Sequence, residues 1–303
     1  MFSIKLMVAT IFLAALFGGG NSSGCRSKKN DSPPTNQMST NENALDGDLK
    51  ILAEGSVSPI TTTFVAVIRD NETYASLRSS AGNLPALTTD FFGSNAIIAA
   101  FLGQRNTTGY SVAISTEPNG QIRVAEKSPR KDAMVGQMIT SPFKLVALPV
   151  TGKPAVNLAL DETFRQAGQL YRISNGSFLI SGGFAGRTET YQLAGKIQLM
   201  RLGNLITIGF AIVGSGSSRE RSLRDFATGL LTDDAFTALV SHGSLVDPPS
   251  GDLRVSGTVV EKSKFVIELD SGPATVPDGY SGKGRVEAES VLRSNEFSRP
   301  PTP

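Results

Sequence analysis

The sequence predicts a mainly β protein with two β-rich domains, each a sandwich or a small barrel. Short runs of β-branched and apolar residues recur along the chain, and Gly, Asn and Ser turn signals separate them at fairly even spacing. In several runs apolar and polar residues alternate, as in strands with one buried face. Helical patterns are few. We expect one short helix in the first domain and one or two in the second.

The chain begins with an export signal at residues 1–24. Lys5 precedes an apolar run from Leu6 to Phe17, which is shorter than the roughly 20 residues that a membrane-spanning helix needs. The run has the length of a signal-peptide core, and small polar residues follow it, as at a cleavage site. The protein is therefore expected to leave the cytoplasm.

Cys25 is the only cysteine, so no intramolecular disulfide is available. It follows Gly24 just beyond the apolar run, in the position of the acylated cysteine of bacterial lipoproteins. Diacylation there would anchor the mature chain to a membrane leaflet, at about 0.8 kcal/mol per buried CH₂. Ser22 stands where an aliphatic residue is usual, so plain cleavage near Gly20 is the alternative. Lipidation of Cys25 at the cell envelope is the preferred interpretation.

The composition divides the chain after residue 24 into a tether, two domains and a tail. Residues 25–48 are rich in Ser, Asn, Thr, Pro and charge, which predicts a flexible tether. Two domains are expected at 49–152 and 153–294, followed by a disordered tail at 295–303. The formal charge is +2, and removal of Lys5 with the signal leaves +1. Such a balance gives little support to nucleic-acid binding.

The first domain is expected to open with a strand over 61–68 and a helix over 71–80 that Asp70 or Asn71 caps. Residues 96–102 are apolar throughout and predict a buried strand. Tyr110, Val112 and Ile114 would share one face of a second strand.

Residues 104–109 would connect these two strands as a hairpin-like loop, in which Gly109 supplies a backbone angle that a Cβ resists. Asn119-Gly120 predicts a tight turn. A strand over 143–150 would close the domain.

In the second domain, Asn175-Gly176 and Gly203-Asn204 predict two hairpin turns. The strongest helical pattern lies within 222–240, where Thr232 and Asp233 would cap a second part. Further strands are expected at 255–260, 265–269 and 285–292.

Catalytic and metal-binding chemistry find little support. His242 is the only histidine, and its place after an expected helix favours a surface role. One cysteine and one histidine exclude multi-thiolate and two-histidine metal sites. The carboxylates are scattered; Asp161-Glu162 and Asp233-Asp234 are interpreted as helix starts. No catalytic residue, metal or cofactor is predicted.

One loop combines a polar tip with an aromatic anchor, as recognition surfaces do. By itself this pattern also fits a simple tight turn before an edge strand. The candidate partner-binding residues are Arg105, Asn106, Thr107, Thr108, Gly109 and Tyr110.

The run around this loop, FLGQRNTTGYSVAI, resembles the signature of the PrcB C-terminal domain family. Residues 67–74 resemble the entry to that domain, and residues 140–149 resemble its closing strand. The similarity extends over roughly residues 60–150. Thr108 is a departure, because the family commonly has a second glycine before the tyrosine.

This resemblance implies a non-enzymatic accessory subunit of a protease complex, here an envelope-anchored one that binds a protein partner. Residues 106–110 are also similar to the NPTTGY loop of chagasin-type protease inhibitors, although the proline is missing. Inhibition is therefore an alternative. A structural envelope protein, or an enzyme with its site in the second domain, are the others.

Overall fold

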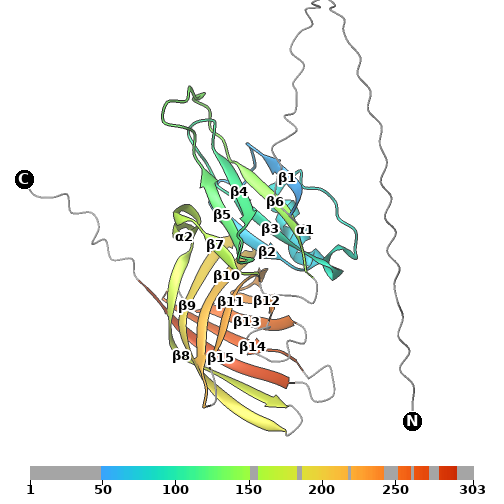
Figure 1. Cartoon of the computed structure of the whole chain (residues 1–303), viewed down its shortest axis with the longest axis vertical. Helices are drawn as coiled ribbons and strands as arrows, with labels where there is room; N and C mark the ends of the chain where they lie inside the picture. Colours follow the sequence, from blue (N-terminus) through green and yellow to red (C-terminus); the bar gives the residue numbers. More distant parts are fainter. Residues whose placement is uncertain are drawn as a thin grey trace, which may run out of the picture. The chain divides into compact units, whose positions relative to one another are not determined.

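The computed structural model describes residues 49–150, 156–182, 186–217, 220–241, 252–260, 263–272 and 280–291. These residues fall in one compact unit, Ala44–Pro303. Two sheets come first in the chain, and eight later strands close into a barrel (Figure 1). The predicted mainly β fold with two β-rich parts is thus confirmed. No helix among the described residues has the length and apolar character that crossing a bilayer requires.

A four-stranded antiparallel sheet has the order β1-β6-β3-β2. Its strands are β1 (Lys50–Gly55), β2 (Phe64–Ile68), β3 (Asn95–Phe101) and β6 (Phe143–Pro149). β2 and most of β3 are buried on both faces, which explains their uninterrupted apolar sequences. The predicted buried strand over 96–102 is therefore confirmed.

Helix α1 (Asn71–Ala81) follows β2 and agrees with the expected helix. The Asp70 carboxylate caps it by accepting a 2.7 Å hydrogen bond from the Thr73 backbone N–H. Tyr74 and Leu77 face the core. A single 3₁₀ turn, η1 (Phe91–Gly93), lies before β3.

The second sheet has the order β4-β5-β7. β4 (Ser111–Thr116) and β5 (Ile122–Lys127) are antiparallel, and the predicted turn joins them with Gly120 at φ 76°. β7 (Leu158–Leu160) pairs in parallel with β5 and leads into α2 (Glu162–Ala167). Asp161 caps α2, so the expected helix start at Asp161-Glu162 is confirmed.

The expected pairing of β3 with β4 is wrong, because the two strands belong to different sheets. The connection crosses from one sheet to the other and does not reverse as a hairpin. Gly103 makes the crossing possible: it has φ 69°, and a Cβ there would lie 2.6 Å from the Thr61 carbonyl oxygen. β3 instead pairs with β2 along one edge and with β6 along the other.

Eight antiparallel strands form the barrel, which closes between its last and first strands. The strands are β8 (Gln169–Gly182), β9 (Arg187–Leu202), β10 (Leu205–Ser215), β11 (Glu220–Thr232), β12 (Ala235–Ser241), β13 (Asp252–Val260), β14 (Lys264–Asp270) and β15 (Tyr280–Ser290). Alternate apolar side chains point inward and form one cluster that includes Tyr171, Phe178 and Phe265. An eight-stranded barrel has an interior that side chains can fill.

The predicted helix within 222–240 is wrong: β11 and β12 occupy this stretch as a hairpin. Asp233 and Asp234 form its two-residue turn with φ of 55° and 73°, and they do not begin a helix. Leu223, Asp225 and Ala227 are all buried, so the period of burial along β11 is two. Pairing along the barrel outweighed the local helical pattern.

The two predicted hairpin turns of the second domain had different outcomes. Gly203-Asn204 joins β9 to β10, with Gly203 at φ 58°. Asn175-Gly176 is not a turn, because β8 continues through it with a shift of register. Gly176 packs against Leu193 of β9, where a Cβ would lie 3.1 Å from the Leu193 Cβ. A bulge thus stands where a turn was expected.

The edge strand β2 lies against β11 of the barrel. The Val67 backbone N–H donates to the Thr228 hydroxyl over 2.9 Å, and the Thr228 and Thr207 hydroxyls are 2.7 Å apart. The Arg69 guanidinium contacts both Asp225 carboxylate oxygens at 2.9 Å. The barrel wall thereby covers the open edge of the sheet.

The expected signal, tether and tail, together with Cys25 and His242, lie outside the described residues.

Candidate functional site

The candidate site is the loop between β3 and β4 together with the longer loop between β5 and β6. Thr108 joins the two: its backbone N–H donates to the Gly136 carbonyl, and its hydroxyl accepts from the Gly136 N–H, both over 2.9 Å. The Thr140 hydroxyl donates to the Thr107 carbonyl over 3.1 Å. Figure 1 shows both loops beyond the ends of β4 and β5.

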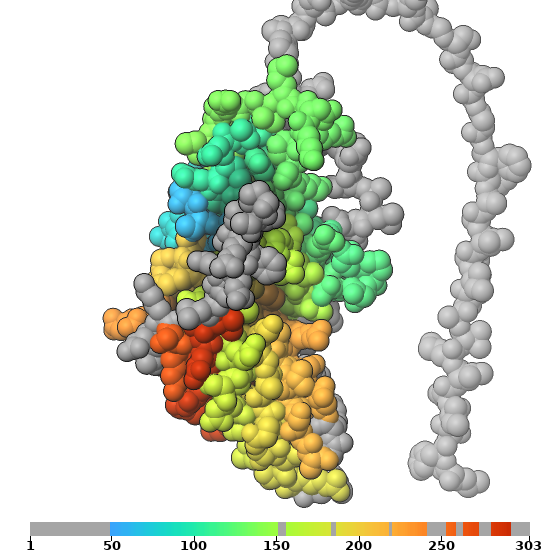
Figure 2. Space-filling model, turned by 90° about the vertical axis from the view of Figure 1, so that its left-hand side faces the viewer, coloured from blue at the N-terminus to red at the C-terminus, as the bar shows by residue number. Residues whose placement is uncertain are grey.

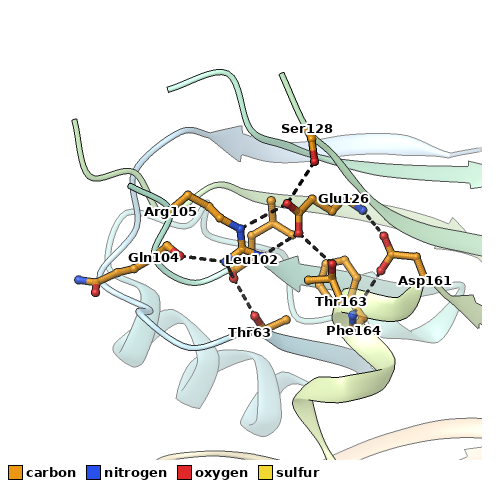
Figure 3. A network of polar contacts seen from close by, with 9 residues as sticks. All are labelled: Thr63, Leu102, Gln104, Arg105, Glu126, Ser128, Asp161, Thr163 and Phe164. Carbon is orange, nitrogen blue, oxygen red and sulfur yellow. Dashed lines mark hydrogen bonds and ion pairs between the residues drawn. The ribbon is translucent and has the colours of Figure 1, made fainter. Parts of the chain in front are cut away.

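Arg105 lies at the base of this site and bonds within the chain (Figure 3). Its guanidinium contacts the Glu126 carboxylate at 2.8 Å and donates to the Leu102 and Gln104 carbonyls over 2.8 and 2.9 Å. It also stands over the Tyr110 ring, 5.8 Å from the centroid. A partner would meet little of this charge, because the Arg105 side chain is only 20% exposed.

Glu126 connects the site to α2. Its carboxylate accepts from the Thr163 hydroxyl over 2.9 Å, and its backbone N–H donates to the Asp161 carboxylate (Figure 3). Burial by itself raises the pKa of Glu126. Hydrogen bonds from Arg105 and Thr163, the charge of Arg105 and a bond from Ser128 outweigh burial and hold the pKa below its ordinary 4.5.

This depressed pKa gives a pH-dependent contribution to stability. The charged form is favoured in the folded state, so the contribution is complete above about pH 4.5 and is lost as the pH falls through the folded pKa. We expect Glu126→Gln to lower the free energy of unfolding by about 1–3 kcal/mol at pH 7. Urea titrations should show that loss shrinking below pH 4.5.

The matched control is Glu117→Gln, since Glu117 is more exposed and lies 4.0 Å from its partner Arg123. Its effect should stay within about 0.5 kcal/mol. An equal loss for Glu126→Gln at pH 7 and pH 3 would contradict the assignment.

Of the other candidate residues, some pack within the protein and others reach the surface. Gly109 has φ 92°, as its sequence suggested, and a Cβ there would lie 2.9 Å from Pro129. Tyr110 packs on the core of the first sheets. Thr107 and Thr108 are half-buried, and Asn106 is exposed. Among the side chains of the candidate residues, Asn106 is therefore the one best placed to meet a partner.

The β5–β6 loop carries an exposed apolar cluster. Of the six large apolar side chains that are exposed in the described residues, three lie in it: Met134 is fully exposed, Met138 is 56% exposed and Ile139 is 63% exposed. Together with Asn106 we call these residues the loop surface. The green residues at the top of Figure 2 belong to this part of the chain.

The loop surface has the chemistry of a protein-binding site. Exposed apolar residues are ordinary when scattered, whereas a cluster marks an interaction surface. Methionine side chains are flexible and polarizable and adapt to varied partners. The hydrogen bonds at Thr107 and Thr108, together with the two backbone bonds that Arg105 and Thr140 exchange, fix the backbone beneath the cluster. In the part of the chain that the structure describes, no three His, Cys, Asp or Glu side chains gather as metal ligands.

Sequence reasoning missed this cluster. It assigned no strand, helix or role to residues 128–139. Met134, Met138 and Ile139 in an otherwise polar loop were the available signal. Their exposure depends on the fold, which places the whole loop outside both sheets.

Comparison with known proteins supports the resemblance over this segment. Residues 96–149 match the family model described as PrcB C-terminal. The match runs from β3 to the end of β6 and includes the loop surface. No curated protein matches the chain significantly.

A solved structure also matches, the crystal structure of a Trp-to-Ala mutant of the vaccine antigen Transferrin Binding Protein B from Haemophilus parasuis. The two sequences are 10% identical, and the alignment covers 59% of this chain and 36% of that chain. With a TM-score of 0.28, this likeness supports no conclusion on fold or function.

Proposed function

We propose that this protein is a non-enzymatic, envelope-anchored binding subunit that associates with a protease complex through the loop surface. The observation that carries the proposal is the match of residues 96–149 to the PrcB C-terminal family. Three of the six large apolar side chains that are exposed in the described residues lie within the same segment. Lipidation of Cys25 would hold the protein at a membrane leaflet, where confinement raises its effective concentration near a partner.

The contacts within the site favour association over catalysis. Arg105 and Glu126 neutralise each other, and their hydrogen bonds join the loop to β5 and α2. The parts left for a partner are apolar side chains and Asn106. Burial of such side chains against a partner provides binding energy, and it requires no catalytic group.

The test is co-purification from the envelope of the producing cells, with full-length protein as bait. We expect the wild type to recover a protease, identified by mass spectrometry and by its activity. Met134→Ser/Met138→Ser/Ile139→Ser should recover at least tenfold less, because exposed anchors each contribute about 1–2 kcal/mol to an interface.

Leu179→Ser is the control, since Leu179 is also exposed but lies on the barrel. It should recover as much protease as the wild type. Equal recovery by the triple variant, with unchanged unfolding, would reject the loop surface as the binding site. Loss of protease activity in the complex would indicate an inhibitor instead of an accessory subunit.

A further inference from the structure

A second surface lies away from the loop surface, where β7 and α2 adjoin barrel strands β8–β11. A groove of about 330 Å³ opens there. Apolar residues from both sides line it, among them Leu160 of β7, Leu170 of β8 and Phe226 of β11. The volume falls at the lower end of the range of ligand-binding clefts.

Three cations stand around this apolar lining: Arg165, Lys196 and Arg224. The last two flank Ala211, which is in register with Lys196 on one side and with Arg224 on the other. All three residues of this row are exposed on the outer wall of the barrel. Two interstrand spacings separate Lys196 from Arg224, which is about 10 Å. The small Ala211 side chain leaves the space between the two charges open.

Carboxylates of the described residues do not occupy this space. Arg165 pairs with Glu162 at 3.0 Å, whereas the described residues offer no ion pair to Lys196 or Arg224. Asp225 also lines the groove, but both of its oxygens bond to Arg69. One oxygen accepts from the Val156 N–H as well, over 3.0 Å. The groove therefore has an excess of positive charge beside an apolar lining.

An open strand edge borders the same groove. β7 is the edge strand of its sheet. The Asn157 carbonyl accepts from β5, and the Asp161 N–H donates to β5. Because backbone groups alternate along a strand, those of Leu158 and Leu160 point to the other edge. Both residues line the groove.

We propose that this groove binds an extended acidic peptide of a partner protein. The peptide would add to the open edge of β7, place an apolar side chain on Leu160, Leu170 and Phe226, and direct carboxylates to Lys196 and Arg224. Carboxylates on alternate residues of a strand lie about 7 Å apart, and side-chain reach covers the remaining separation. The strand edge favours a peptide over a lipid or a free anion, because only a peptide backbone can both donate to the carbonyls and accept from the N–H groups of a strand.

The test measures fluorescence anisotropy of a labelled, acetylated Glu-Leu-Glu-Leu-Glu amide with the exported chain from residue 25 onward. We expect binding that weakens as salt is raised. Lys196→Glu/Arg224→Glu should weaken it at least tenfold. The control Lys50→Glu/Arg187→Glu makes the same charge change on exposed residues away from the groove and should bind as the wild type does.

A second peptide with N-methylated backbone amides keeps the charges but blocks strand pairing. We expect it to bind at least tenfold more weakly. Equal binding of both peptides, no binding of either, or equal loss in both double variants would overturn the proposal. So would saturable binding of octanoate or inorganic phosphate in the absence of any peptide binding. None of these outcomes bears on the loop surface, which is tested separately.

Discussion

Arg69→Met is expected to lower the free energy of unfolding by about 3–5 kcal/mol, because it leaves a buried carboxylate without its counter-charge. The Asp225 side chain is fully buried, and that of Arg69 is 11% exposed. Besides the carboxylate, Arg69 donates to the Phe226 and Leu239 carbonyls, at 2.6 and 3.2 Å. These contacts join β2 to two strands of the barrel. Urea denaturation of the variant and wild type measures the loss.

A second variant distinguishes the cost of the unpaired charge from the cost of lost packing. Arg69→Met/Asp225→Leu removes both charges and should recover more than half of the lost stability, since apolar replacements of buried pairs are often neutral. Arg187→Met changes an exposed arginine and should stay within about 0.5 kcal/mol. A double variant as unstable as Arg69→Met would contradict the unpaired-charge explanation.

Phe178→Ala is expected to lower the free energy of unfolding by about 3–5 kcal/mol, because it leaves a cavity in the barrel. The Phe178 ring is fully buried, and it lies where Gly282 and Gly284 of β15 leave room. A Cβ on Gly282 would lie 2.3 Å from the ring, so this interior position has no space for a larger neighbour. Thermal or urea unfolding measures the effect.

Two further variants test the same packing. Gly282→Ala should also destabilise the barrel, whereas Phe178→Leu should cost less than Phe178→Ala because it fills part of the cavity. Tolerance of Gly282→Ala would show that the ring is not confined in this way.

Much of the fold was predictable from local signals. The helix after Asp70, the buried strand over 96–102 and the turns at Gly120 and Gly203 all depend on neighbouring residues, and all were found. Prediction failed where pairing with strands far away in the sequence determines the secondary structure. Residues 222–240 have a helical pattern of leucines, but pairing with β10 and β13 makes them strands.

The site was only partly predictable, for the same reason. The sequence placed a recognition loop at Arg105–Tyr110, with a core or edge-strand role for Tyr110 as the alternative, and Tyr110 does pack on the core. The sequence did not reveal that Glu126 of β5 would neutralise Arg105, because this ion pair joins residues that are 21 positions apart. The apolar cluster of Met134, Met138 and Ile139 emerges only once the sheets leave that loop outside.

The most direct test of the central proposal is site-specific photocross-linking in the producing cells. Benzoylphenylalanine replaces Met134 in the full-length protein, and in a matched control it replaces Leu179, which is exposed on the barrel. We predict an adduct with a component of a protease complex from position 134 and not from position 179. Equal adducts from both positions, or none from position 134 while the protease still co-purifies, would contradict binding through the loop surface.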